Sequence, residues 1–269
     1  MAPPAISVPT LGFFRQIVRG YFRRHFHAVR ISHVERFVSD GSPLIVYANH
    51  SSWWDPMVSV LLADRLMRRR KHFAPMDAIS LQRYAILKRI GIFPVEMKTQ
   101  RGAAQFLRMG ESILHSGGVL WITPQGQFVD TRQRPLDFKP GLAALARRVT
   151  QRRGGCTVLP LAIEYTFWNE RLPETLLHFG SPVRISEADL STESIQKRLV
   201  TALETTMDEL KDLAFERNPI RFETLIGGTM GTGGFYAIGQ RIKAFVQRRP
   251  YQPDHTAAGT QEPLQESHK

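Results

Sequence analysis

The stretch VYANHSSWWDP, residues 46–56, places a histidine and an aspartate five positions apart after an apolar run. Within one helix five positions rotate by about 140°, so His50 and Asp55 would not share a face. They can meet if the chain turns between a strand and a helix that starts near Asp55. The carboxylate would then orient one imidazole nitrogen and leave the other free to accept a hydroxyl proton. In the alternative interpretation, Asp55 only caps a helix and His50 is an ordinary loop histidine.

The flanking patterns predict the elements that would hold this pair. The unbroken apolar run at 43–48 predicts a buried strand, and the residues from Pro56 predict a helix with Asp55 as its N-cap. Further strands are expected at 92–95, 119–123, 157–165 and 175–185, and further helices at 11–30, 81–90, 99–115, 141–152 and 192–217. Strands that alternate with helices predict an α/β fold, with a single mixed-sheet domain flanked by helices.

Composition and cysteine usage narrow the class of protein. The 269 residues are 42% hydrophobic and 22% charged, as in an ordinary globular domain. The single cysteine, Cys156, excludes an internal disulfide and a cysteine-based zinc site. The start, MAPPAISVPT, lacks the pattern of a secretory signal, and no run of about 18 uncharged apolar residues predicts a transmembrane helix.

The net charge of +12 favours a polyanionic partner: nucleic acid, an anionic membrane or a phosphorylated cosubstrate. The basic segment at 11–30 mixes arginines with aromatic and aliphatic residues, which is typical of an amphipathic helix at a membrane surface. A plain packing helix is the alternative. Because no nucleic-acid-binding signature is present, a nucleic-acid partner is not expected.

The chain divides into four expected regions. Residues 1–38 would form a basic amphipathic membrane-surface segment, and 39–220 the α/β domain. Residues 221–249 are rich in glycine, apolar and basic residues, and they lack the Lys-Ser/Thr ending of a nucleotide-binding loop. The Pro-, Gln- and Thr-rich tail at 250–269 is expected to be disordered.

Four blocks in order resemble the lysophospholipid (glycerolipid) acyltransferase family. They are NHSSWWDP, then Gly91–Val95, Thr123–Phe128 and Val158–Ala162, and the resemblance spans about residues 40–185. It implies a glycerolipid-acyltransferase-like fold and a peripheral enzyme at the cytoplasmic face of a membrane. It also implies His50 as general base, with Asp55 orienting it. The acceptor hydroxyl of a membrane lipid would attack an acyl-CoA or acyl-carrier-protein thioester, with no metal and no other cofactor.

The sequence departs from the family pattern where arginines usually clamp the phosphate of the acceptor. Glu96 and Met97 follow the second block, and Gln125 and Phe128 replace the usual glutamate and arginine of the third. Two hypotheses follow. In one, a set of nearby arginines reaches back to a phosphorylated glycerolipid: Arg101, Arg132 and Arg134. In the other, the acceptor is neutral, as in a glycolipid or a carotenoid glycoside.

Other substrate contacts are expected around these blocks. The loop at Gln125 and Gly126 is a candidate for oxyanion or thioester contacts through the backbone N–H of Gly126, although a turn glycine would look the same. Trp53 and Trp54 could flank the acyl chain or lie at the headgroup level, with core packing as the alternative. A non-catalytic membrane-binding protein is the remaining hypothesis, motivated by the departures at Gln125 and Phe128.

Overall fold

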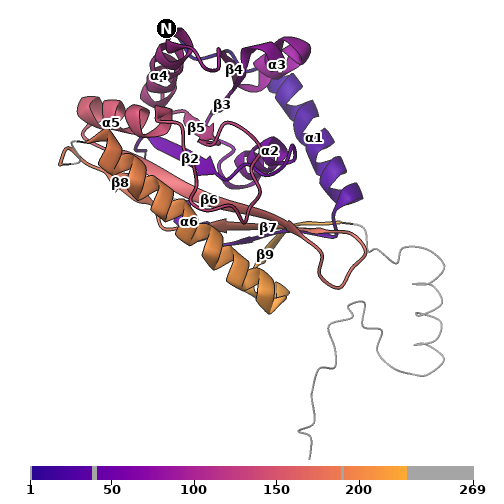
Figure 1. Cartoon of the computed structure of the whole chain (residues 1–269). Helices are drawn as coiled ribbons and strands as arrows, with labels where there is room; N and C mark the ends of the chain where they lie inside the picture. The colour runs from indigo at the N-terminus through magenta and orange to yellow at the C-terminus, as the bar shows by residue number, and fades with distance from the viewer. Residues whose placement is uncertain (1, 38–40, 189–190, 229–269) are drawn as a thin grey trace, which may run out of the picture.

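A computed structural model of the chain describes residues 2–37, 41–188 and 191–228 (Figure 1). The elements, with η for 3-10 helices, are α1 (Val8–His25), β1 (Ala28–Ser32), η1 (Val34–Arg36), β2 (Leu44–Ala48), α2 (Asp55–Leu66), β3 (His72–Asp77), α3 (Ala78–Arg83), η2 (Ala85–Ile90), β4 (Ile92–Val95), α4 (Gln100–His115), β5 (Val119–Ile122), α5 (Gly141–Arg153), β6 (Cys156–Thr166), β7 (Glu174–Phe179), β8 (Val183–Ile185), α6 (Thr192–Glu216), η3 (Pro219–Arg221) and β9 (Glu223–Gly227).

These strands form a single mixed sheet in the order β4-β3-β5-β2-β6-β7-β1-β9, with β8 paired to β6. Strands β4, β3, β5, β2 and β6 are parallel to one another. Strand β7 runs antiparallel to β6 and parallel to β1, and β9 runs antiparallel to β1. The predicted α/β fold with a mixed sheet is therefore confirmed.

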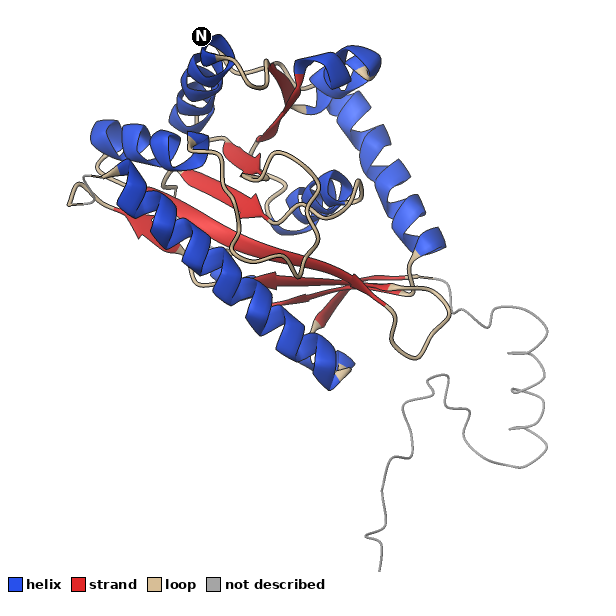
Figure 2. Ribbon diagram, in the orientation of Figure 1, coloured by secondary structure: helices blue, strands red, loops and turns tan. Residues whose placement is uncertain are grey.

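Helices cover both faces of the sheet, and the central strand β2 shows how each face is filled (Figure 2). Side chains alternate along a strand. Ile45 and Tyr47 belong to the hydrophobic cluster beneath α4, α5 and α6. Leu44, Val46 and Ala48 point to the other face and belong to the cluster beneath α1 and α2. All five residues of β2 are buried, which explains the unbroken apolar run in the sequence.

Helix α1 begins after Ser7, whose side chain accepts a hydrogen bond from the Thr10 amide. Its arginines do not all face solvent, because Arg15 and Arg19 both reach the buried Asp64 of α2. Burial alone would raise the pKa of Asp64, but hydrogen bonds from Arg68 and Arg19 lower it below its usual value. This ionic contact fastens α1 to the domain.

The helix predicted at 11–30 is wrong at its end, because the helix stops at His25 and Ala28–Ser32 form β1. Val29 and Ile31 are fully buried in the sheet, where β1 pairs with β7 and β9. These partners are about 150 to 200 residues away, so tertiary pairing overrides the local helical pattern. Strand β1 and strand β9 lie outside the expected domain limits of 39 and 220, and both belong to the main sheet.

The structure also differs from the predicted elements in several smaller respects. Strand β3, which begins at His72, was not predicted. The helix expected at 81–90 is instead α3 followed by η2, which ends at Gly91 with a φ of 99°. The strand expected at 175–185 is divided into β7 and β8. The expected glycine-rich segment is described only as far as 228, and the expected disordered tail at 250–269 lies outside the described residues.

Candidate active site

The parallel arrangement of β2 and β5 brings two of the sequence blocks to one edge of the sheet. Ligand sites in such sheets lie at the carboxyl ends of the strands. His50 follows the end of β2, and Gln125 follows the end of β5. The His50 amide donates to Gln125 Oε1 at 2.9 Å, and the Val129 amide donates to the His50 carbonyl at 2.8 Å. The two loops therefore hold each other.

Asn49 fixes where the chain leaves β2. Its side-chain Nδ2 donates to the Ile163 carbonyl at 2.9 Å, and its Oδ1 accepts from the Ile163 amide at 2.8 Å. The buried side chain of Asn49 thus replaces the backbone partner that β6 loses where β2 ends. His50 is directed into the turn as a result.

The predicted contact between His50 and Asp55 is present, with Nδ1 of the imidazole 2.8 Å from Oδ2 of the carboxylate. The same oxygen accepts from the backbone amides of Ser51 and Ser52 at 2.9 and 3.0 Å. Asp55 is the first residue of α2, with Trp54 as the N-cap, so the prediction of Asp55 as N-cap is wrong. Its carboxylate points back into the turn because the amides of that turn, together with the imidazole, are its donors.

Tyr165 supplies a fourth donor and was missed in the sequence. Its hydroxyl donates to Asp55 Oδ1 at 2.7 Å, and burial, followed by the nearby Asp55 carboxylate, raises the pKa of the phenol well above its usual value. Strand β6 pairs with β2 only up to Leu161, so Tyr165 lies beyond the end of β2, beside the turn. Its position three residues after the fourth sequence block was the available indication.

The second imidazole nitrogen is free to react. An ionised carboxylate only accepts hydrogen bonds, so the Nδ1 proton points to Asp55 and Nε2 carries a lone pair. Nε2 of His50 makes no hydrogen bond with any residue that the structure describes. The side chain of His50 is 17% exposed, and the ring of Phe128 lies 4.5 Å from the imidazole, centroid to centroid. This arrangement can accept a proton from a substrate hydroxyl.

The loop after β5 serves partly a different purpose from the one predicted. Gln125 is buried and holds the His50 backbone. The N–H of Gly126 donates to the Thr123 carbonyl at 3.0 Å, so the expected oxyanion contact through that group is wrong: a turn already uses the donor. Gly126 has a φ of 64°, and a Cβ there would lie 2.5 Å from Nζ of Lys139. Lys139, another residue that sequence reasoning missed, therefore places an ammonium against this turn.

The three arginines proposed as phosphate clamps differ in their availability. The guanidinium of Arg132 donates two hydrogen bonds to Asp130, at 2.9 and 2.7 Å, and its backbone amide donates a third. Arg134 donates to the carbonyls of its own loop and lies 3.6 Å from Asp208 of α6. Arg101, exposed in the first turn of α4, makes no hydrogen bond or ion pair with a described residue. None of the three makes a described contact with His50.

The two tryptophans have different environments. Trp54 is half-buried and packs against Phe22 and Phe26 of the N-terminal region, with ring centroids 5.8 and 4.8 Å apart. Trp53 is 53% exposed and lies against Trp54 at 4.6 Å. Trp54 therefore follows the packing alternative, and Trp53 offers an exposed indole beside the turn that carries His50.

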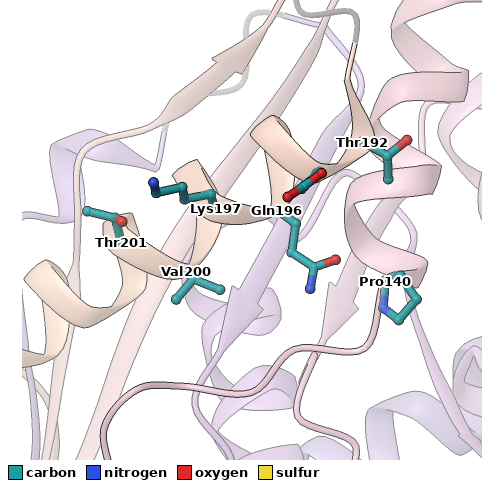
Figure 3. Close-up of a pocket in the computed structure, with 7 residues that line it drawn as sticks. Pro140, Thr192, Gln196, Lys197, Val200 and Thr201 are labelled. Atoms are coloured by element: carbon teal, nitrogen blue, oxygen red, sulfur yellow. The ribbon is translucent and has the colours of Figure 1, made fainter.

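Other candidate sites lack these features. Burial raises the pKa of the Cys156 thiol to about 12, which makes it a poor nucleophile. A pocket of about 580 Å³ lies between Pro140 and the first turns of α6 (Figure 3), and none of the residues discussed around His50 lines it. Among the described residues, no group of three or more His, Cys, Asp or Glu side chains could hold a metal. No helix in the described part of the chain is long and apolar enough to cross a membrane.

Comparison with known proteins identifies a family and a similar fold. Residues 28–164 match the model of a family described as Acyltransferase. A solved structure of the 1-acyl-sn-glycerophosphate (LPA) acyltransferase PlsC from Thermotoga maritima is similar in fold, with a TM-score of 0.51 and 18% sequence identity, covering 76% of this chain and 79% of that chain. Comparison with curated proteins finds no match.

Proposed function

The chain belongs to the acyltransferase family, and on that premise we propose that it moves an acyl chain from a thioester, acyl-CoA or acyl-carrier protein, to a lipid hydroxyl. The observation that carries this proposal is the His50 imidazole, held by Asp55 at 2.8 Å through Nδ1 while Nε2 stays without a described partner. A base oriented in this way suits proton abstraction from an alcohol.

The proposed reaction is direct attack. Nε2 of His50 accepts the hydroxyl proton while the hydroxyl oxygen forms a bond to the thioester carbonyl carbon. The carbon–sulfur bond then breaks, and the departing thiolate takes the proton back from the imidazolium. Asp55 stabilises the imidazolium, and four donors hold the carboxylate in place. The ammonium of Lys139 beside Gly126 is a candidate to stabilise the negative charge that develops on the carbonyl oxygen.

Purified full-length chain tests the proposal directly. Given acyl-CoA and a panel of lysophospholipids and neutral glycolipids, the protein should release free CoA with at least one acceptor. The His50→Ala variant should lose this activity, by about 10³-fold. His115→Ala is the matched control, because that histidine is exposed at the end of α4. A His50→Ala variant that keeps its rate would refute the proposed base.

A lysophospholipid-type acceptor is the first candidate, and the likeness in fold to the LPA acyltransferase supports it. A neutral acceptor is the second candidate, because the ring of Phe128 lies over His50 where the family pattern has an arginine. The described arginines nearby, Arg132 and Arg134, are held by Asp130 and by their own loop. None of the contacts described for His50 involves a guanidinium.

The Phe128→Arg variant separates these acceptors. If the native acceptor is neutral, the added guanidinium should raise kcat/KM for a phosphorylated lysolipid relative to a neutral glycolipid, by about tenfold. Phe215→Arg is the control, because that side chain is 76% exposed on α6. A wild-type preference for the phosphorylated acceptor would reject the neutral candidate.

We also propose that the protein works at a membrane surface, as a peripheral protein of the cytoplasmic face. The support is chemical: a lipid acceptor resides in a membrane, and the net charge of +12 favours anionic headgroups. Exposed Phe13 and Tyr21 on α1 give that helix apolar surface beside its arginines. Wild-type protein should sediment with anionic vesicles, and its absence from the pellet would refute the proposal.

A further inference from the structure

The segment 78–90, which contains α3 and η2, exposes three large hydrophobic side chains close together in the sequence. Ile79, Tyr84 and Ile86 are 69%, 60% and 55% exposed. Leu81 and Ile90 are buried and anchor the segment to the domain. An apolar surface that other described residues leave uncovered marks a contact site for another molecule.

The charges of this segment have one sign. Arg83, Lys88 and Arg89 are exposed, and none forms an ion pair with a described residue. No acidic residue occurs between Asp77 and Glu96. Cations interleaved with isoleucine and tyrosine are the composition that binds at the interface of an anionic membrane. Association with a second copy through this face would bring like charges together.

The position of the segment connects it with the proposed active site. Strand β3, which leads into α3, is parallel to β5, and β5 is parallel to β2. Helix α3 therefore starts at the same carboxyl edge of the sheet as the turn of His50. At the other end, the Ser7 amide donates to the Arg89 carbonyl at 2.8 Å, which places the start of α1 beside η2. Figure 1 shows α1 next to α3 at this corner of the molecule. Val8 and Phe13 of α1 are 78% and 67% exposed.

We propose that the α3–η2 segment is a second membrane-contact element, which seats on anionic lipid together with the start of α1. This inference rests on the proposed function and adds to it the location of the contact and the headgroup charge. Apolar side chains would enter the interface, while the three cations meet the headgroups. The edge of the sheet that carries His50 would then face the layer that contains the lipid acceptor.

The apolar contribution is tested with full-length protein carrying Ile79→Ser, Tyr84→Ser and Ile86→Ser. Sedimentation with phosphatidylcholine vesicles that contain phosphatidylglycerol should show binding at least about tenfold weaker than wild type. The matched control carries Phe215→Ser and Ile220→Ser, because those side chains are 76% and 88% exposed on α6 and η3. Its binding should equal that of wild type. Equal binding of the α3–η2 variant, or an equal loss in the control, would overturn the proposal.

The charge contribution is tested with Arg83→Ser, Lys88→Ser and Arg89→Ser. Binding to the phosphatidylglycerol-containing vesicles should fall by about fivefold for each charge removed. Binding to pure phosphatidylcholine vesicles should not change. A loss that is the same on both kinds of vesicle would overturn the proposed headgroup contact.

Two further measurements separate this proposal from the proposed function. The variant with Ile79→Ser, Tyr84→Ser and Ile86→Ser should transfer acyl groups to a short-chain, water-soluble acceptor at the wild-type rate. The His50→Ala variant should bind vesicles normally and transfer nothing. If wild type has no transferase activity but the vesicle results hold, only the proposed function fails. Light scattering tests the alternative that a second copy occupies this face. If the variant with Ile79→Ser, Tyr84→Ser and Ile86→Ser is a monomer where wild type is a dimer, and its vesicle binding is intact, the membrane proposal fails.

Discussion

His50 and His178 each contact a carboxylate through one ring nitrogen, but they differ at the second nitrogen. The His178 imidazole lies 2.7 Å from Ser32 Oγ through Nδ1 and 2.8 Å from Glu209 Oε2 through Nε2. It is 2% exposed. His50 uses Nδ1 for Asp55 and leaves Nε2 without a described partner. A contact between His and a carboxylate is therefore insufficient for catalysis; the second nitrogen must also be accessible.

The location of each residue in the sheet explains the difference. His178 lies within β7, paired with Ser32 of β1 on one side and Ala162 of β6 on the other. Its ring is enclosed between the sheet and α6, where Glu209 is located. His50 lies beyond the end of β2, where the ladder stops and the chain turns. Strand ends thus supply reactive positions that strand interiors cannot.

The largest expected effect comes from replacing each imidazole by an amide. His50→Gln should lower the rate of acyl transfer by about 10³-fold with little change in stability. His178→Gln should keep the rate within about twofold and lower the free energy of unfolding by about 1–3 kcal/mol, because buried hydrogen bonds are lost. CoA release and urea denaturation measure the two quantities. Equal loss of activity in both variants would remove the distinction between the two histidines.

Replacing the two carboxylates should likewise lower the rate of acyl transfer at Asp55 but not at Glu209. Asp55→Asn removes the charge that steadies the imidazolium, so kcat should fall by about 10²-fold or more. Glu209→Gln should leave kcat unchanged and alter stability by less than about 1 kcal/mol, because the Glu209 side chain is 47% exposed. Steady-state kinetics of both variants test this, and a fully active Asp55→Asn enzyme would contradict the proposed role of the carboxylate.

A smaller effect is expected from removing the hydroxyl groups of Tyr165, which contacts Asp55, and Ser32, which contacts His178. Tyr165→Phe leaves Asp55 with three of its four donors, so kcat should fall by about threefold to tenfold with KM unchanged. The acidic limb of the pH–rate profile should also move, since Tyr165 acts through Asp55 on the imidazole. Ser32→Ala should affect only stability, by about 1 kcal/mol. An unaltered profile in Tyr165→Phe would show that the tyrosine is merely structural.

The smallest effect concerns pH and stability. Burial lowers the pKa of His178, and the attraction of Glu209 only partly opposes this. Because the pKa in the folded state is below that of the unfolded chain, stability is lost as the pH falls below the ordinary value for histidine. His178→Asn should therefore lose less stability than wild type between about pH 7.5 and about pH 5.5. Urea denaturation at both values measures the difference; an equal loss would contradict it.

Much of the fold could be predicted because the elements near the site have strong local patterns. Strand β2 is fully buried and reads as an unbroken apolar run, and α6 carries its buried residues along one stripe. Strands β1 and β9 were missed because they depend on partners from distant segments, and β3, which contains a proline, lacks an unbroken apolar run. A local pattern cannot indicate which strand will pair with it.

The site, like the fold, could be predicted only in part. The spacing of His50 and Asp55 showed only that the two side chains can meet, and the resemblance of four blocks to the acyltransferase family turned this possibility into a prediction. Tyr165 and Lys139 were missed because they come from β6 and from the loop before α5. The role of Gln125 was also missed, since its contact is with the backbone of a residue 75 positions away.

The sequence by itself determined the pair of reactive groups, the alternation of strands and helices, and the family to which the chain belongs. Only the tertiary structure decided that Asp55 turns back into the loop, that Tyr165 supports it, and that Nε2 of His50 remains accessible while both nitrogens of His178 are engaged. The physical reason is distance along the chain. Local preferences set the conformation of each segment, whereas the contacts that orient a side chain come from strands and loops that meet only when the sheet is assembled.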